Sequence, residues 1–438
     1  MFDLPKYGDG ICLARMAELL DALAIDRARL QERSVAITGS NGKGSTAAFC
    51  ASIASAYGLR TGLFTSPHLF RANERFQVGG VPIDDEPMHE LARRIRNAID
   101  IVSRHCGETF GAFEAMFALA CLHFQENGCE FMVFEAGIGG RYDPVRLLGS
   151  HLTAVTSVDY EHVELLGHSL QLIVSDKSDA CASGGVIIYG ENCRELRAHI
   201  VEYNRNRKVE SLFVRDEIKI GSETVAAAGQ NFDFAFGDHG FRSLDVALPG
   251  SFQLNNAAIA AALFLRWLER AGLFEAGKHL ETAVRSGLRD TRWPGRLEAI
   301  AQNPLVVIDV GHTPDGIRQS LAGLKQTYGA EAWILVAGVS FDKKAEEIAD
   351  ALAPAFDIII CTAAHHKVSD AAALAAFMRK RNPQAHVEVA ATIEQAFSAS
   401  RAQAAALDRK VYVAGGLFTA IEFAAVARGL NAKDLVFF

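Results

Sequence analysis

The sequence has no Cys-x-x-Cys pair, no block of basic residues and no apolar run long enough to cross a bilayer. Its eight cysteines are scattered, several within apolar patterns, so we expect buried reduced thiols and no zinc site. A net charge of -8 without clustered Lys or Arg argues against nucleic acid as the main partner. The longest apolar helical pattern, at 257–268, is too short for a membrane span, and the N-terminus shows no basic segment followed by a long apolar one. We therefore expect a cytoplasmic protein that binds neither nucleic acid nor membrane.

What the sequence does contain is an alternation of short β-branched runs with helix-length segments. The runs lie at 35–37, 131–135, 152–158 and 186–189, and their spacing predicts a parallel sheet wrapped by helices. Short strand-like pieces between 208 and 248 predict a β-meander appended to that sheet. A Pro-Gly turn at 294–295 forms a joint, and a second α/β series starts at 305–309. We therefore expect an α/β protein of two domains, 1–290 and 291–438, with a ligand cleft between them.

The most informative segment is Thr-Gly-Ser-Asn-Gly-Lys-Gly-Ser-Thr at 38–46, which follows a β-branched run and precedes an Ala-rich helical pattern. Its glycines let backbone N–H groups curl around phosphate oxygens, Lys43 supplies a cation, and a Ser or Thr hydroxyl can bind Mg²⁺. The strict nucleotide loop has a glycine at the position of Ile37 and a hydroxyl directly after the lysine, so this loop is a shorter variant. A purely structural turn is the alternative. The flanking strand and helix favour nucleotide binding by Asn41, Gly42, Lys43, Gly44, Ser45 and Thr46.

Four further features fall at or near the carboxyl ends of predicted strands, where doubly wound sheets assemble their sites. Ser66 follows the run at 61–64 and offers a hydroxyl to Mg²⁺, although an ordinary Ser-Pro turn explains it equally well. Glu135 ends an apolar run before a Gly-rich turn, where a carboxylate can hold a hard cation. His162 has acidic neighbours, which favours metal or phosphate binding. Lys177 lies at what the pattern makes the start of a helix, and taken alone it is best interpreted as a surface lysine balanced by two aspartates.

Taken in order, these segments resemble a known family. The loop at 39–45 is followed by Phe-Thr-Ser-Pro-His-Leu-Phe-Arg-Ala-Asn-Glu-Arg at 64–75, Phe-Glu at 113–114, Glu-Ala-Gly-Ile-Gly-Gly-Arg at 135–141, His162 and Lys177. Pro-Gly-Arg-Leu-Glu at 294–298 and Ile-Asp-Val-Gly-His-Thr-Pro at 308–314 complete the series. The series is similar to the ordered motifs of the folylpolyglutamate synthase and dihydrofolate synthase family of the Mur-ligase superfamily. The resemblance implies an N-terminal Mur-ligase-like P-loop ATPase domain, with a parallel sheet and a small β-meander, and a C-terminal Rossmann-like domain.

The resemblance also implies an activity and roles for residues. The expected reaction is ATP-dependent ligation of L-glutamate to a pteroate-like or folate-like acceptor through an acyl phosphate, by a monomer. Lys43 would hold the β- and γ-phosphates, and two Mg²⁺ sites would form. The first metal would be bound by Ser45, Ser66 and Glu135, and the second by His162 and a carbamylated Lys177. The nucleotide would be contacted by Asn256, Arg296 and Asp309, and the substrates by Phe113, Glu114, Asp143 and His312.

The chain departs from the family pattern in several places. Residues 142–146 read Tyr-Asp-Pro-Val-Arg in place of Leu-Asp-Ala-Thr-Asn, which leaves the acceptor open. Residues 176–179 read Asp-Lys-Ser-Asp in place of Glu-Lys-Ala-Gly, and the added negative charge either tunes a metal site or pairs with an unmodified ammonium. Thr313 replaces an Asn, and 365–367 read His-His-Lys in place of a Pro-Arg-Ala type sequence. The alternatives are a ligase for another carboxylate, a nucleotide-switch or regulatory ATPase, and a family member that binds ATP without catalysis.

Overall fold

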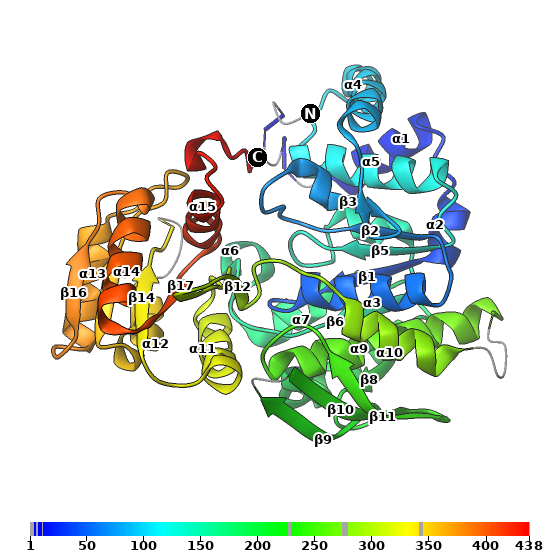
Figure 1. Cartoon of the computed structure of the whole chain (residues 1–438). Coiled ribbons are helices and arrows are strands. Elements are labelled where there is room, and N and C mark those ends of the chain that lie inside the picture. Colours follow the sequence, from blue (N-terminus) through cyan, green and yellow to red (C-terminus); the bar gives the residue numbers. More distant parts are fainter. Residues whose placement is uncertain are drawn as a thin grey trace.

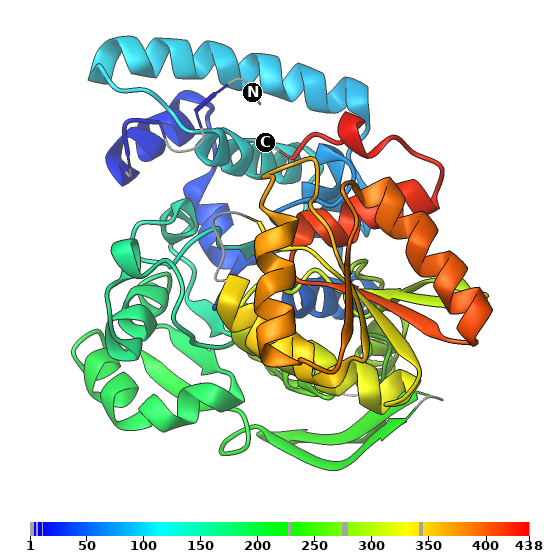
Figure 2. The same ribbon diagram turned by 90° about the vertical axis from the view of Figure 1, so that its left-hand side faces the viewer.

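The computed structural model describes residues 4–5, 8–10, 12–226, 229–273, 279–340 and 345–437. These residues form two lobes, each built on its own β-sheet (Figure 1). Figure 2 turns the second lobe toward the viewer and shows its helices stacked on both sides of its sheet. The predicted division between residues 290 and 291 falls between the last helix of the first lobe and the first strand of the second.

The first lobe contains an eight-stranded sheet in the order β4-β3-β2-β5-β1-β6-β7-β8. The strands are β1 Ser34–Thr38, β2 Thr61–Phe64, β3 Phe76–Val78, β4 Val81–Pro82, β5 Phe131–Glu135, β6 Leu152–Val155, β7 Val186–Tyr189 and β8 Glu210–Phe213. The strands pair in parallel except at one edge, where β3 pairs antiparallel with both β2 and β4. The run predicted at 152–158 is a strand only as far as Val155. The rest of it is a loop at the carboxyl edge of the sheet.

Helices cover both faces of this sheet. On one face lie α3 Lys43–Ala56, α9 Phe252–Ala271 and α10 Leu280–Asp290, and on the other α1 Leu13–Ala22, α4 Asp85–Cys106 and α5 Ala112–Glu126 (Figure 1). The remaining helices are α2 Arg27–Arg33, α6 Val163–Leu166, α7 Leu170–Ser178 and α8 Arg197–Arg205. Helix α9 is apolar almost all round because it packs between the large sheet and a second, smaller one.

The smaller sheet corrects one expectation. Strands β9 Lys219–Ala226, β10 Gly229–Phe236 and β11 His239–Val246 form a separate three-stranded antiparallel sheet, and only β8 joins the large one. The predicted appended meander is therefore wrong in its attachment. Phe232, Phe234 and Phe236 alternate along β10 on one buried face, which packs against α9. This apolar face gives the small sheet its own partner, so it forms a layer rather than an extension.

The second lobe has a six-stranded sheet in the order β12-β13-β17-β14-β15-β16. The strands are β12 Glu298–Gln302, β13 Leu305–Ile308, β14 Trp333–Ala337, β15 Ile358–Cys361, β16 His386–Val389 and β17 Lys410–Ala414. The helices are α11 Pro314–Tyr328, α12 Ala345–Leu352, α13 Ala371–Arg381, α14 Ile393–Leu407 and α15 Leu417–Ala427. Strand β12 is antiparallel to β13 and was not predicted. The other five strands are parallel, as the expected Rossmann-like domain requires.

The C-terminal segment crosses back from the second lobe to the first (Figure 1). The Phe437 ring lies 6.2 Å from the His68 ring and 4.8 Å from the Phe418 ring, centroid to centroid. Arg75, itself buried, donates from Nη2 to the Phe437 carbonyl at 3.3 Å. The lobes are thus in contact through this tail as well as through the linker. Among the described residues, no helix is long and apolar enough to cross a membrane.

Candidate functional site

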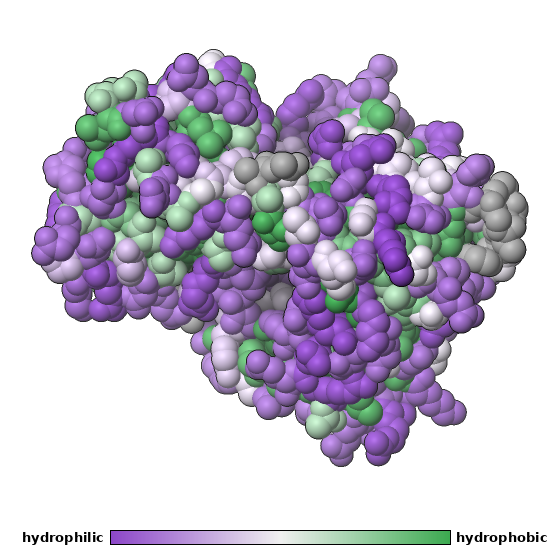
Figure 3. Space-filling view, turned by 60° about the horizontal axis from the view of Figure 1, so that its bottom comes forward, coloured by the Kyte–Doolittle hydropathy of each residue, from purple (hydrophilic) through white to green (hydrophobic). Residues whose placement is uncertain are grey.

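A cavity of about 1460 Å³ lies where the carboxyl edges of the two large sheets face each other. The surface is hollowed between the lobes (Figure 3). Predicted site residues from both lobes line it: Asn41, Gly42, Lys43, Gly44, Ser45, Ser66, Phe113, Glu114, Glu135, Asp143, His162, Asn256, Arg296, Asp309 and His312. Thr46 and Lys177 are fully buried beside it. The structure therefore brings together residues that lie up to 271 positions apart, Asn41 and His312.

The loop between β1 and α3 has the backbone of an anion-binding turn. Gly42 has a φ of 86° and precedes Lys43, the first residue of α3, and a Cβ at Gly42 would lie 2.5 Å from Asn256 Oδ1. Asn41 donates from its backbone N–H to Ser157 Oγ at 2.8 Å, which fixes the loop to the segment after β6. Within the part of the chain that the structure describes, Asn41 Nδ2 and Thr46 Oγ1 are buried without a hydrogen-bond partner. Such polar atoms fit a site that a polar ligand completes.

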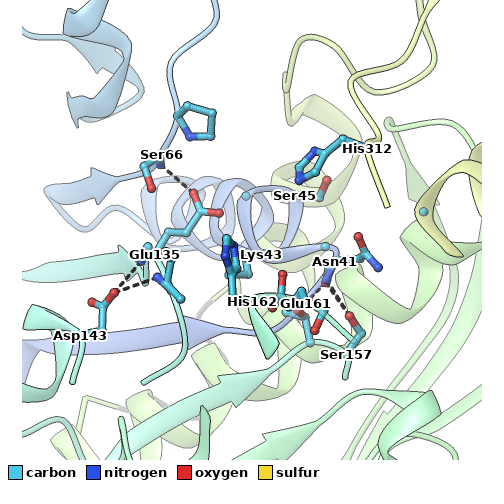
Figure 4. A pocket seen from close by; sticks show the side chains of 18 of the residues that line it. Asn41, Lys43, Ser45, Ser66, Glu135, Asp143, Ser157, Glu161, His162 and His312 are labelled. Atoms are coloured by element: carbon cyan, nitrogen blue, oxygen red, sulfur yellow. Dashed lines mark hydrogen bonds between the residues drawn. The ribbon is translucent and has the colours of Figure 1, made fainter. Parts of the chain in front are cut away.

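Lys43 is the cation at the centre of the cavity, with Glu135 on one side and Glu161 and His162 on the other (Figure 4). Its Nζ donates to the Gly39 carbonyl at 2.8 Å. The positive charge of Lys43 opposes the effect of burial on the pKa of Glu135, and burial still raises that pKa above its ordinary value. Arg296 and Arg75 act on the Glu135 pKa in the same direction as Lys43, so this buried carboxylate lies among three cationic side chains.

Glu135 is the carboxylate that best fits a metal role. It ends β5, is buried, and accepts a hydrogen bond from the Ser66 backbone N–H at 2.9 Å. Ser45 is buried, and its Oγ accepts from Gln253 Nε2 at 3.3 Å. No group of three or more His, Cys, Asp or Glu side chains among the described residues could hold a metal. One carboxylate with two hydroxyls is a sparse set, as expected for Mg²⁺, which keeps waters and takes phosphate oxygens as ligands.

Lys177 differs from its expected place. It lies in the last turn of α7 instead of at a helix start, and it is fully buried. The surface-lysine interpretation is therefore wrong. Its Nζ donates to Glu161 Oε1 at 2.6 Å. Burial lowers the pKa of Lys177, although the negative charge of Glu161 opposes this effect. Burial alone would raise the pKa of Glu161, but the positive charges of Lys177 and Lys43 outweigh it and lower that pKa to about 2.

The two aspartates that flank Lys177 contact other groups. Asp176 Oδ1 accepts from the Gly140 backbone N–H at 2.9 Å, and Asp179 Oδ2 accepts from Arg141 Nε at 2.6 Å. The expectation that they pair with the Lys177 ammonium is therefore wrong. Residues 176 and 179 lie on one side of the helix, three positions apart, whereas Lys177 points to another side.

Glu114 and Asp143, the two carboxylates predicted to contact substrates, accept hydrogen bonds from other groups of the protein. Both Glu114 oxygens accept from Arg15 Nη2 at 3.0 Å, in a buried ion pair. Asp143 Oδ2 accepts from the Gly137 and Ile138 backbone N–H groups at 2.8 and 3.1 Å, and burial raises the Asp143 pKa to about 6. These carboxylates shape the cavity wall and are held by these bonds.

A phenylalanine completes this wall. The Phe113 ring lies 5.8 Å from the Phe64 ring, centroid to centroid, and a Cβ at Gly137 would come within 2.8 Å of it. It presents an apolar surface to the cavity.

The second lobe contributes Arg296, Asp309 and His312 to the cavity. Asp309 follows β13, is buried, and accepts from Ser320 Oγ at 2.8 Å and from the Leu297 backbone N–H at 3.1 Å. Burial raises its pKa, and the nearby Arg296 opposes that rise. Thr313 Oγ1 donates to Asn41 Oδ1 at 3.0 Å. Thr313, which stands in place of an Asn in the family pattern, thus links the second lobe directly to the loop at 38–46, the phosphate loop.

Three site residues were not predicted from the sequence. Gln253 donates to Ser45 and accepts from Asn256 Nδ2 at 2.9 Å, which connects α9 to the phosphate loop. Arg15 holds Glu114, and Glu161 holds Lys177. Arg15 carried one usable signal, since it is a charged residue beside Met16 in an apolar helix face. Glu161 was noted only as an acidic neighbour of His162.

Comparisons with known proteins find relatives in both sequence and fold. A family model described as "Mur ligase, glutamate ligase domain" matches residues 295–417. The dihydrofolate synthase/folylpolyglutamate synthase of Bacillus subtilis is 30% identical over 324 residues, 74% of each chain, and the folylpolyglutamate synthase of Lacticaseibacillus casei is 30% identical over 360 residues, 81% of each. Mycobacterium tuberculosis folylpolyglutamate synthase complexed with ADP is 25% identical with a TM-score of 0.84, covering 95% of this chain and 94% of that one. An FPGS-AMPPCP-folate complex is 27% identical with a TM-score of 0.76, covering 92% and 97%.

Proposed function

Because the chain belongs to the folylpolyglutamate synthase/dihydrofolate synthase family, we propose that it is an ATP-dependent ligase that joins glutamate to a carboxylate of a pteroate-like or folate-like acceptor. One observation carries the proposal. A single cavity is lined by the phosphate loop, by Glu135 from the first lobe and by Arg296 and Asp309 from the second. A site shared by two lobes suits a reaction in which phosphate, acceptor and amino acid must meet.

The phosphate loop is the nucleotide site in this proposal. Residues 41–46 surround the phosphates with backbone N–H groups at the start of α3, and Lys43 provides the mobile charge. Asn256 supports the loop from α9, and Arg296 and Asp309 reach the nucleotide from the second lobe. These residues neutralise and orient the transferring phosphoryl group without forming covalent bonds to it.

Ser45, Ser66 and Glu135 would hold Mg²⁺, which when bound polarises the phosphate oxygens. The buried Glu135 carboxylate, whose pKa is raised by burial, has an unfavourable environment for its charge that a cation would relieve. His162 lines the same cavity and belongs to the proposed second metal site.

Carbamylation of Lys177 fits its surroundings. Burial lowers the pKa of this amine, and only the neutral amine reacts with CO₂. The product is an anion in place of an ammonium, which suits a cation site. The modification also requires that the amine leave its present pairing with Glu161.

The acceptor would lie against the wall formed by Phe113, Ile138 and Tyr142, with Glu114 and Asp143 shaping that wall. His312 faces it from the second lobe, where the amino acid would enter. Closure of the lobes excludes water, which protects an acyl phosphate until the amine attacks it. The hydrogen bond from Thr313 to Asn41 joins the second lobe to the phosphate loop beside the cavity.

The test is incubation of the purified protein with ATP, Mg²⁺, L-glutamate and a panel of pteroates and folates, followed by mass spectrometry. We expect a product heavier than one acceptor by one or more glutamyl units, formed together with ADP. Hydrolysis of ATP without any acceptor or glutamate would contradict the proposal. The altered segment at 142–146 favours a second candidate, a ligase for a different carboxylate, which glutamate-dependent ADP release without any folate or pteroate product would support.

A further inference from the structure

The last turn of α7 holds the Gly-rich loop at 137–143, which lines the cavity on the acceptor side. Gly137, Ile138, Tyr142 and Asp143 of this loop face the cavity, whereas Gly140 and Arg141 are not among the lining residues. Those two residues lie against α7 instead. A Cβ at Gly140 would come within 2.6 Å of the Lys177 carbonyl oxygen, so the loop backbone touches the helix backbone directly.

Asp179 gathers three donors around one carboxylate. Its Oδ2 accepts from Arg141 Nε at 2.6 Å, and its Oδ1 accepts from Tyr203 Oη at 2.9 Å and lies 3.2 Å from Arg207 Nη1. Arg141 Nη2 in turn donates to Tyr203 Oη at 3.1 Å. The Asp179 side chain is 10% exposed and the Arg141 side chain 35%, so the carboxylate is shielded while the guanidinium is partly open to water.

The same helical turn reaches the phosphate side of the cavity. Lys177 is bonded to Glu161, which lines the cavity beside Lys43. Asp176 holds the loop backbone through the Gly140 N–H at 2.9 Å. One side of the turn thus contacts the phosphate side of the cavity through Lys177, and another side contacts the loop at 137–143, the acceptor loop, through Asp176. The aspartate at 179 stands where the family signature has glycine, so this chain adds a side chain at the point of contact.

We propose that Asp179 is a positioning residue that fixes the acceptor loop by binding the Arg141 guanidinium and thereby sets the affinity for the acceptor. The inference rests on the proposed ligase function. Arg141 is not among the residues that line the cavity, whereas its neighbour Tyr142 is. The contact of Arg141 with Asp179 therefore fixes the position of the loop, and with it the position of Tyr142 relative to the acceptor. Loss of the contact releases the loop without touching the phosphate loop or Glu135.

Two variants test the contact from its two ends. Asp179→Asn keeps the shape and removes the charge, and Arg141→Met keeps an unbranched apolar stem and removes the guanidinium. Each should raise the KM for the acceptor about tenfold and leave kcat and the KM for ATP unchanged. The reason is that each variant loses only the charge-assisted hydrogen bond between Arg141 and Asp179, the loop anchor. The double variant should be no worse than either single one, since both remove the same contact. Asp179→Glu should recover part of the affinity.

The control is Asp357→Asn, which makes the same change in an Asp–Arg pair of the second lobe outside the cavity. Asp357 accepts from Arg409 at 2.5 and 2.7 Å. It should leave all three kinetic constants at the wild-type values. An unchanged acceptor KM in folded Asp179→Asn, or a fall in kcat with constant KM, would overturn the proposal.

A second readout separates this proposal from the proposed function. Hydrogen exchange should speed up in a peptide spanning 137–143 in Asp179→Asn and in Arg141→Met, and stay unchanged in Asp357→Asn. If the wild-type protein forms no glutamylated product but the exchange changes as described, the proposed function fails and the loop anchor stands. If exchange in this segment does not change, the anchor fails whatever the activity.

Discussion

The pair formed by Lys177 and Glu161 gives the strongest prediction about stability. The two side chains are 1% and 14% exposed, and their charged atoms lie 2.6 Å apart. Lys177→Met keeps the length of the side chain and its apolar stem and removes the ammonium. Glu161 is then left as a buried carboxylate without its main counter-charge.

The size of the effect follows from the carboxylate. The fall of the Glu161 pKa from an ordinary 4.5 to about 2 corresponds to about 3 kcal/mol of differential stabilisation of its charged form. The opposing burial cost at Lys177 makes the net worth of the intact pair smaller than that. Removal of one partner is different, because the other stays buried and unpaired, and such changes cost about 3–5 kcal/mol. We therefore expect Lys177→Met to lower the free energy of unfolding of the first lobe by that amount.

Equilibrium unfolding in urea at pH 7, in bicarbonate-free buffer and followed by circular dichroism, measures the loss. The matched variant is Lys177→Met with Glu161→Gln, which removes both charges and should recover most of the lost stability. Equal losses in the single and double variants would show that the unpaired carboxylate is not the cause. A single variant within about 0.5 kcal/mol of wild type would refute the reasoning altogether, since that is the range of an ordinary surface change.

The remaining predictions concern charge, metal and space. Lys43→Ala should lower kcat at least about 100-fold through lost stabilisation of the transferring phosphate, measured as ADP release; near-wild-type turnover would remove Lys43 from the site. Chelation with EDTA should abolish ligation and excess Mg²⁺ should restore it, whereas activity that survives chelation would exclude the metal role. Because the Glu161 pKa is lowered on folding, its contribution to stability is present above about pH 4 and is lost as pH falls toward about 2, so Glu161→Gln should flatten acid unfolding in that window; an unchanged profile would contradict this. Gly140→Ala places a Cβ 2.6 Å from the Lys177 carbonyl oxygen and should destabilise by about 1–3 kcal/mol in thermal unfolding, while Gly221→Ala, with open space around it, should not; equal melting temperatures would refute the contact.

Much of the fold could be predicted because buried parallel strands carry a strong local signal. The predicted runs at 131–135 and 186–189 match β5 and β7, and the start of the second series at 305–309 matches β13. Strand β12 was missed because Glu-Ala-Ile-Ala-Gln has little β-branched character and gains its pairing from β13 across a turn. The attachment of the small sheet was wrong for a related reason, since strand neighbours are set by distant contacts that no short pattern records.

The site was predicted as a set of residues and not as a set of contacts. The motifs named side chains that would gather, because the phosphate loop, Ser66, Glu135 and Asp309 each lie at or just after the end of a strand. They did not give partners such as Arg15 and Glu114, which are 99 positions apart. For Lys177 the error was the helix register. A helix placed to end at 178 puts the aspartates at 176 and 179 on a different side from the lysine, and that separation excludes the expected ammonium pairing.

The tail at 435–437 provides a second connection between the two lobes, in addition to the linker. The polypeptide leaves the first lobe at the linker and returns toward it in the C-terminal segment (Figure 1). There the Phe437 ring stacks on the His68 ring. The buried Arg75 guanidinium donates to the Phe437 carbonyl, so the tail supplies an acceptor to a charged side chain of the first lobe. Separation of the lobes at this contact would therefore leave a buried charged side chain without one of its hydrogen-bond acceptors, which costs free energy.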